Sequence, residues 1–159
     1  MSADGAAIGG GVRRAVAEDL SAVERIVVDA FTPYIPRAGR KPAVMSNDYA
    51  ALIAAGAVFV RTAAPCEAAV AGLVVLRDEP DVLYVDTLAV DPAAHGKGHG
   101  RALLEFAAEE ARRRGFPALR LCTNVVMTEN IAFYSHLGWE ETHRGTEAGF
   151  QRVFYRKAV

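Results

Sequence analysis

The sequence is poor in cysteine and in long apolar runs. Its 159 residues include two cysteines, Cys66 and Cys122, which are too few for a disulfide framework and do not stand at the spacing of metal ligands. No metal is therefore expected, and a reducing, cytoplasmic setting is the expectation. The longest apolar run, 70–76, is far shorter than the ~18 residues that a membrane helix requires. These absences predict a soluble protein that has no contact with a membrane.

An excess of charge of either sign is also missing. Eighteen Lys and Arg residues face nineteen Asp and Glu residues, so the formal net charge is −1. Because a polyanion requires a clustered basic face, this balance predicts no nucleic-acid partner. Residues 1–11 lack the basic start and apolar run of a signal peptide and are expected to form a flexible tail. Residues 12–159 then fit a single domain.

Hydrophobic periodicity predicts the elements of this domain. Strands are expected at 12–16, 58–63, 68–77, 82–90, 118–123, 139–143 and 150–157. Helices are expected at 20–31 after an Asp19 cap, from a Ser46 cap to 55, at 101–114 and at 128–137. On the third helix, we expect the ion pairs Arg101–Glu105, Glu109–Arg113 and Glu110–Arg114.

The order of these elements predicts the fold class. The three strands between 58 and 90 are joined by short turns and should form an antiparallel meander. The strand–helix–strand unit that follows should be a crossover between two parallel strands. The sequence therefore predicts an α/β (α+β) fold, with a mixed, mostly antiparallel twisted sheet of six to seven strands, one parallel crossover and about four helices.

The loop D-P-A-A-H-G-K-G-H-G-R, residues 91–101, is typical of a phosphate site. It does not match the P-loop, because Gly98 follows Lys97, nor the dinucleotide fingerprint, because Arg101 stands at the last glycine position. A helix that begins near Gly100 would still leave the amides of 96–101 as unpaired donors at its positive end. From the residues of the loop alone, a phosphate site and a plain flexible turn both remain open.

Two stretches carry a family resemblance. V-D-T-L-A-V-D-P-A-A-H-G-K-G-H-G-R-A-L-L, residues 85–104, resembles the acetyl-CoA-binding motif of the GNAT acyltransferase superfamily, and N-I-A-F-Y-S-H-L-G-W, residues 130–139, resembles its second signature. The predicted element order also agrees with this family from Val12 onward. Two histidines depart from the motif: His95 replaces the usual Arg or Gln, and His99 replaces an aliphatic residue. Since an unperturbed histidine titrates near ~6.5, His99 is a candidate for a pH-dependent contact. The alternative is that both histidines are tolerated loop substitutions.

The resemblance implies an N-acetyltransferase that moves an acetyl group from acetyl-CoA to a primary amine by direct transfer in a ternary complex. It implies that Tyr134 protonates the departing thiolate and that Asn130 binds the pantetheine arm. The other cofactor residues that it implies are Leu88, Ala89 and Val90 for the pantetheine, and His95, Gly96, Lys97, Gly98, His99, Gly100 and Arg101 for the pyrophosphate. A non-catalytic acyl-CoA sensor of the same fold is the alternative.

The general base is less well determined. Asp86 lies on a strand that should be central, where desolvation would raise its pKa toward a useful value. Pairing with an arginine is the alternative for this carboxylate. Cys122, on the neighbouring parallel strand, is expected to be a small core residue.

The resemblance also implies that the amine acceptor binds along the irregular segment after the first helix. Tyr34, Arg37, Asp48 and Tyr49 are the candidate acceptor residues. Arg37, together with Arg40 and Lys41, would favour an acceptor that carries a carboxylate, and a solvated charge run is the alternative. The acceptor class therefore stays at a small-molecule or peptide amine. Exposed edge strands are compatible with a homodimer.

Overall fold

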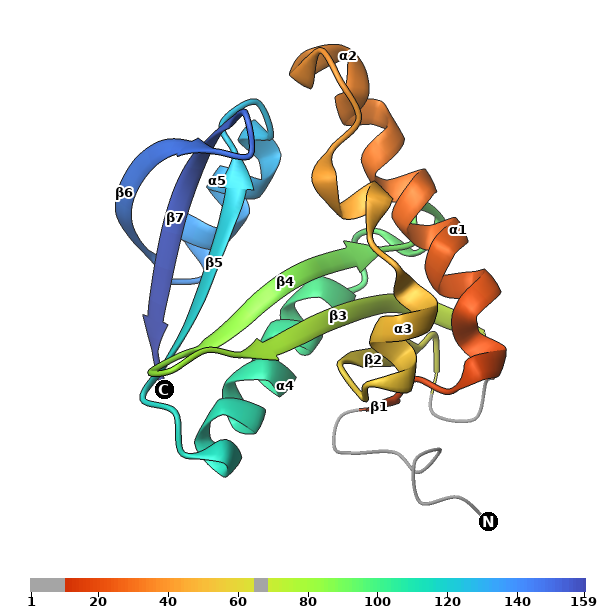
Figure 1. Cartoon of the computed structure of the whole chain (residues 1–159). Helices are drawn as coiled ribbons and strands as arrows, with labels where there is room; N and C mark the ends of the chain where they lie inside the picture. Colours follow the sequence, from red (N-terminus) through yellow and green to blue (C-terminus); the bar gives the residue numbers. More distant parts are fainter. Residues whose placement is uncertain (1–10, 65–68) are drawn as a thin grey trace.

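The computed structural model describes residues 11–64 and 69–159. Residues 1–10 of the expected tail, and Cys66 with its turn, lie outside the described residues. The rest forms one seven-stranded sheet in the order β1-β2-β3-β4-β5-β7-β6, with helices on both faces (Figure 1). One pair, β4–β5, is parallel and the others are antiparallel, which confirms the predicted fold class.

The elements have the following bounds. The strands are β1 (Val12–Arg14), β2 (Val58–Thr62), β3 (Val70–Asp78), β4 (Leu83–Val90), β5 (Ala118–Asn124), β6 (Glu140–Glu147) and β7 (Phe150–Ala158). The helices are α1 (Leu20–Phe31), α2 (Ile35–Ala38), α3 (Tyr49–Ala54), α4 (His99–Arg114) and α5 (Thr128–His136). No helix in the described part of the chain has both the length and the apolar character needed to cross a membrane.

The two parallel strands separate soon after they meet. β4 and β5 pair at Leu83–Leu119 and Tyr84–Arg120, and then diverge toward their carboxyl ends (Figure 1). At the same level the register between β3 and β4 shifts, so that Asp86 becomes the extra residue of a β-bulge. A bulge bends the strand that contains it. The sheet therefore opens at Asp86, between β4 and β5.

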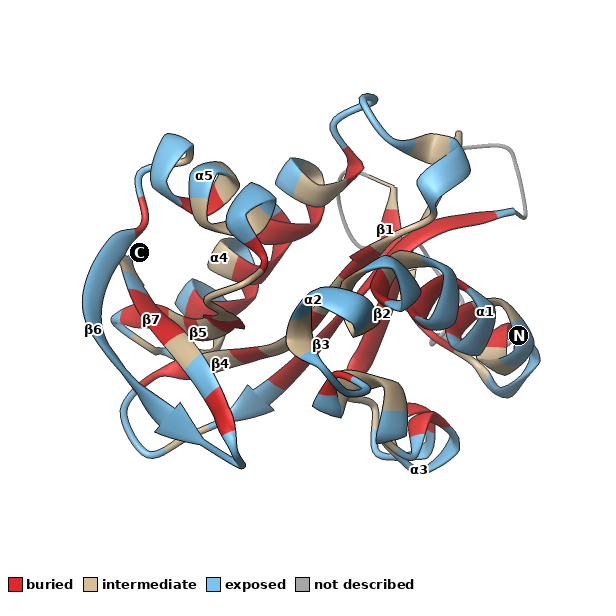
Figure 2. Cartoon of the chain, turned by 90° about the horizontal axis from the view of Figure 1, so that it is seen from above, coloured by how far each residue is buried: buried red, intermediate tan, exposed pale blue. Residues whose placement is uncertain are grey.

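Two apolar cores hold the sheet, one on each face. On one face, Leu103 and Ala107 of α4 pack with strand residues such as Leu83 and Leu121. On the other, Val23 and Ile26 of α1 pack with residues such as Leu73 of β3. Figure 2 shows buried residues along the central strands, whereas β6 is exposed throughout its length. Because both faces of β3 and β4 are covered, these strands form a rigid frame for the loop that follows them.

Two helix caps differ from the predictions. Asp19 does not cap α1, because its carboxylate accepts from Arg13 at 2.7 and 2.9 Å and from the Val16 N–H at 2.8 Å. Ser46 does not cap α3, because it ends a short 3-10 turn, and Asp48 accepts from the Ala51 N–H at 3.0 Å instead. In both cases a short 3-10 turn precedes the helix.

One predicted ion pair on α4 is also wrong. Arg113 does not pair with the exposed Glu109 but with Glu110, at 2.7 Å, and Arg114 binds Glu110 at 2.8 Å as predicted. Glu110 is only 4% exposed, and a buried carboxylate requires partners. Arg113 therefore pairs with the buried glutamate, which needs a partner, and not with the exposed one. The predicted Arg101–Glu105 pair forms at 3.1 Å.

Candidate functional site

The glycine loop forms the junction between β4 and α4. Asp91 starts a 3-10 turn by accepting from the Ala93 N–H at 3.0 Å, and Gly96 and Gly98 then adopt φ values of 79°. Only glycine occupies this left-handed region without a steric cost. The first α-helical bond of α4 runs from the Ala102 N–H to the Gly98 carbonyl. The amides just before Ala102 are therefore left as donors for an anion.

A groove extends from this loop to Tyr134, and we call it the long groove. Its volume is about 570 Å³, which lies within the ~300–1,000 Å³ of small-molecule sites. It brings together every predicted cofactor residue except the exposed Lys97. The lining residues are Ala30, Phe31, Tyr34, Leu88, Ala89, Val90, Ala94, His95, Gly96, Gly98, His99, Gly100, Arg101, Glu129, Asn130, Phe133 and Tyr134.

The two unusual histidines occupy different environments. His95 is exposed at the rim, whereas His99 is buried and its Nδ1 accepts from Arg61 Nε at 3.0 Å. Burial lowers the pKa of His99 below 6.5, and the positive charges of Arg61 and Lys97 lower it further. His99 therefore stays neutral at neutral pH, which suits a position where an apolar side chain was expected.

Helix α5 contains Asn130 and Tyr134, the two predicted site residues of the second signature. Tyr134 is buried in an aromatic cluster, with ring centroids 5.8 Å from Trp139 and 5.7 Å from Tyr155. Burial raises the pKa of Tyr134, and the neighbouring Cys122 and Tyr155 add to the effect, so its hydroxyl remains protonated at neutral pH. Asn130, one turn earlier, donates from Nδ2 to Thr123 Oγ1 at 3.4 Å.

A second cavity, the inner pocket, occupies the opening between β4 and β5. Its volume is about 70 Å³. Phe31, Leu88, Asn130 and Tyr134 line both this pocket and the long groove, so the two cavities adjoin at Tyr134. The remaining lining residues are Pro42, Ala43, Val44, Val85, Asp86, Thr87, Leu121, Cys122, Thr123, Asn124, Met127, Phe150 and Arg152.

Asp86 faces the inner pocket from β4. Its carboxylate accepts from Arg77 Nη2 at 2.6 Å, and from Asn47 Nδ2 and Thr87 Oγ1 at 3.2 Å each. The pairing with an arginine, which the sequence left open, is therefore present. The Asp86 side chain is only 11% exposed and lines the inner pocket, whereas the side chain of its partner Arg77 is 53% exposed.

Cys122 lies across the pocket on β5, and the prediction of a core residue is wrong. Its half-buried thiol contacts the Tyr84 hydroxyl at 3.2 Å and Arg152 Nη1 at 3.4 Å. Asp86 and Cys122 each follow the last β4–β5 pair, Tyr84–Arg120, by two residues. Because the strands diverge after that pair, a cavity opens between them, and Cys122 lines it.

Two predicted acceptor residues, Tyr34 and Arg37, contact α5. The Tyr34 hydroxyl donates to Glu129 Oε2 at 3.1 Å, and Arg37 binds Glu129 Oε1 at 2.7 Å. Hydrogen bonds from Arg37 and Thr128 lower the pKa of Glu129 to about 2. Tyr34 lines the long groove, whereas Arg37 lines neither cavity. These contacts join the segment after α1 to α5 across the long groove.

The other two predicted acceptor residues have structural contacts. Asp48 caps α3, and Tyr49 is buried with its hydroxyl donating to the Val44 carbonyl at 2.6 Å. Neither residue lines the inner pocket. Arg152, which does line it, was missed by the sequence analysis, because its position depends on the pairing of β7 with β5. The local sequence indicates only that Arg152 lies on a strand, on the face opposite to the buried Val153.

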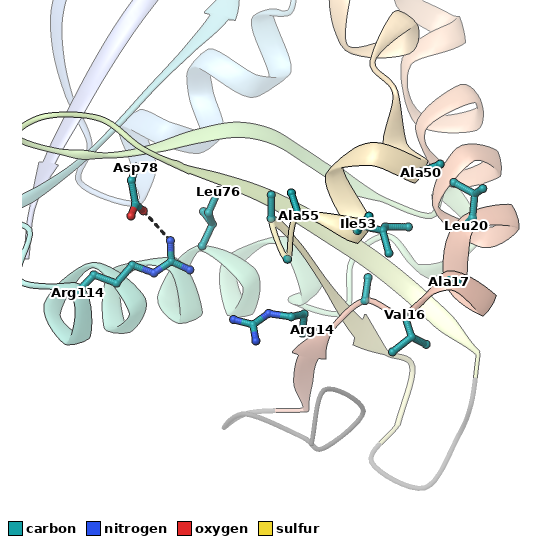
Figure 3. Close-up of a pocket in the computed structure, with 14 residues that line it drawn as sticks. Arg14, Val16, Ala17, Leu20, Ala50, Ile53, Ala55, Leu76, Asp78 and Arg114 are labelled. Atoms are coloured by element: carbon teal, nitrogen blue, oxygen red, sulfur yellow. Dashed lines mark hydrogen bonds and ion pairs between the residues drawn. The ribbon is translucent and has the colours of Figure 1, made fainter. Parts of the chain in front are cut away.

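A larger groove, of about 840 Å³, lies between α3, the segment after β1 and the strand β3 (Figure 3). It contains none of the predicted site residues, and its charged pair, Arg114 and Asp78, is joined at 2.7 Å. Within residues 11–64 and 69–159, no three His, Cys, Asp or Glu side chains are grouped to hold a metal ion. The long groove and the inner pocket therefore remain the candidate site.

Parts of this chain are similar in sequence to known N-acetyltransferases. A 78-residue stretch is 38% identical to N-alpha-acetyltransferase 80 of Mus musculus, covering 49% of this chain and 24% of that protein. A 62-residue stretch is 39% identical to the uncharacterized N-acetyltransferase YjgM of Escherichia coli K12, covering 39% of this chain and 37% of that protein. The matches thus span well under half the length of either relative.

The fold is similar to that of a solved structure, the PaiA N-acetyltransferase of Thermoplasma acidophilum in complex with coenzyme A. The TM-score is 0.77 at 15% identity, over 93% of this chain and 98% of that chain. Residues 20–139, which include the glycine loop and α5, match the model of the acetyltransferase (GNAT) family. Since this model covers most of the chain, the chain belongs to the GNAT acetyltransferase family.

Proposed function

We propose that the protein is an acetyl-CoA-dependent N-acetyltransferase, which transfers the acetyl group to a primary amine by direct transfer in a ternary complex. The observation that carries this proposal is the junction of the long groove and the inner pocket at Tyr134. One cavity leads from the anion-binding loop, and the other ends beside a carboxylate. A cofactor thioester and an amine would therefore meet at a protonated hydroxyl.

The residues of the long groove fit acetyl-CoA. The backbone of Leu88, Ala89 and Val90 continues past the last pair with β5, which leaves a strand edge for the pantetheine amides. The glycine loop offers amides to the pyrophosphate, with His95, Lys97 and Arg101 at its rim. Asn130 is the side-chain partner for the pantetheine. The Thermoplasma relative, which has the same fold, contains coenzyme A.

The inner pocket supplies the groups that acyl transfer requires. Asp86 binds the acceptor ammonium and takes one proton from it, after which the nitrogen attacks the thioester carbonyl carbon. The C–N bond forms and the C–S bond breaks. The leaving thiolate takes the proton of Tyr134, and the second proton lost by the nitrogen restores the phenol. One proton is released to solvent for each acetylated amine.

Tyr134→Phe tests this proposal. The variant should lower kcat about 100-fold, the range of a single general acid, with acetyl-CoA affinity within about twofold of wild type. Thiol release measures kcat, and calorimetry measures binding. Tyr155→Phe is the matched control, because it removes a hydroxyl from the same aromatic cluster but lines neither cavity. Equal turnover of the two variants would contradict the acid role of Tyr134.

A separate measurement distinguishes the enzyme from a sensor. Acetyl-CoA, but not ATP or NAD, should raise the melting temperature, because a ligand that binds only the native state stabilises it. Thiol release should then occur with at least one amine of a broad panel. Stabilisation without any thiol release would favour a non-catalytic acyl-CoA-binding domain over the enzyme.

A further inference from the structure

Arg152 is the charged residue of the inner pocket that has no carboxylate partner. It lies on β7 opposite Asn124 of β5, and its Nη1 donates to Cys122 Sγ at 3.4 Å. Its Nε is buried and lacks a hydrogen-bond partner, and Arg152 forms no ion pair with any residue of the described ranges. A thiol sulfur is a weak acceptor for a guanidinium. The arginine therefore retains the capacity to bind an anion.

Other arginines of this region are already paired. Arg77 binds Asp86 at 2.6 Å, Arg120 binds Glu79 at 2.9 Å, and Arg144 binds Glu141 at 2.8 Å. Arg40 lies over the Phe150 ring at 3.8 Å and donates to the Ala148 carbonyl. Arg152 also lies over the Phe150 ring, at 5.5 Å. It differs from these arginines because it lines the inner pocket and has a buried nitrogen without a hydrogen-bond partner.

The inner pocket also has two walls of opposite charge. Asp86 stands on β4, where its Oδ1 already accepts from Arg77 and its Oδ2 accepts only from the neutral Asn47 and Thr87. Arg152 stands beside Cys122 on the β5–β7 side. The volume of about 70 Å³ is several times the ~10–15 Å³ that one water occupies by the same kind of measure, so it suits a small polar head group. Such a site matches a group with a positive and a negative end a few bonds apart.

We propose that the acceptor is a small amine that carries a carboxylate beside the amino group, as an α-amino acid does. This inference rests on the proposed function and names its substrate class. The carboxylate replaces the Cys122 sulfur as the acceptor of the Arg152 guanidinium, in the forked geometry that arginine favours. The ammonium then lies toward Asp86, next to Tyr134. The products are an N-acetyl amino acid, coenzyme A as the thiol, and one proton.

Pairs of acceptors that differ only in the carboxylate test the inference. Phenylalanine is compared with 2-phenylethylamine, and leucine with 3-methylbutylamine, by thiol release at saturating acetyl-CoA. The wild-type protein should prefer the amino acid of at least one pair by about 10- to 100-fold in kcat/KM, as a charge-assisted contact predicts. Arg152→Met should abolish this preference while leaving acetyl-CoA affinity unchanged.

Arg156→Met is the matched control, since Arg156 lies on the same strand but lines neither cavity. It should keep the wild-type preference. Equal use of both members of every pair by the wild type, or an unchanged preference in Arg152→Met, would overturn the inference.

Binding of the same compounds in the presence of coenzyme A separates this inference from the proposed function. A carboxylate preference in binding that Arg152→Met removes, without thiol release, would contradict the enzyme but support the anion site. Thiol release with amines alone, and no preference in binding, would support the enzyme but overturn the anion site.

Discussion

The two sides of Tyr134 are built in different ways. The long groove is lined mainly by one continuous stretch, 88–101, and is completed by α5 and by residues at and just after the end of α1. The inner pocket is lined by residues that are far apart in the sequence, from β4, β5, β7, α5, the end of α1 and the segment before α3. A cavity lined mainly by one stretch depends largely on local conformation, which glycines and a helix start determine. A site built from distant side chains depends on how the strands pair and diverge.

The largest expected effect belongs to the inner pocket. Asp86→Asn should lower kcat/KM for the amine about 100-fold, the lower range for a lost general base. Acetyl-CoA affinity should not change, because Asp86 does not line the long groove. Arg77→Met is the control, since it removes the ion pair but keeps the carboxylate. An unchanged kcat/KM for the amine in Asp86→Asn would exclude Asp86 as the base.

The next effect belongs to the glycine loop. The double substitution Gly96→Ala and Gly98→Ala places two Cβ atoms at φ values of 79°, at a cost of about 1 kcal/mol each. If this strain is relieved by a change of loop conformation, the KM for acetyl-CoA should rise about 30-fold, with little change in the KM for the amine. Steady-state kinetics with each substrate varied measures both constants.

Gly39→Ala is the control for backbone strain. Gly39 ends α2 with a φ of 75°, and, as at Gly96 and Gly98, an added Cβ would meet no atom within 4 Å. It should therefore lower the melting temperature without changing the KM for acetyl-CoA. An equal rise in that KM for Gly39→Ala would mean that general destabilisation, and not the loop, causes the effect.

The smallest effect concerns pH and His99. Its pKa in the folded protein lies below 6.5, so the unfolded chain takes up the proton first as the pH falls. The contribution of a neutral His99 to stability is therefore complete above about pH 6.5 and is lost as the pH falls below it. Urea unfolding at pH 7.5 and 5.5 should show a smaller loss of unfolding free energy in His99→Leu than in wild type. An identical loss in both proteins would mean that His99 does not titrate in this range.

The predicted fold agrees with the structure wherever periodicity and turns are local. The meander β2–β4, the crossover through α4 and the helix α5 all follow from spacing within short segments. The predicted caps of α1 and α3 were wrong because the Asp19 carboxylate accepts from Arg13 and the Val16 N–H, and because Ser46 ends a 3-10 turn before Asp48 caps α3. Preferences of single residues do not specify these contacts. The predicted i,i+4 partner of Arg113 was wrong because Arg113 binds the buried Glu110 at the i,i+3 spacing instead.

The sequence by itself determined the strands, the glycine loop and the position of Tyr134 on α5, since each depends on residues close together in the chain. Only the tertiary structure decided that β4 leaves β5 after Tyr84, so that Asp86 and Cys122 face a cavity. It also decided that Arg152, from the last strand, lines that cavity beside Cys122. The physical reason is that strand register and strand divergence are set by packing on both faces of the sheet, which no local pattern encodes.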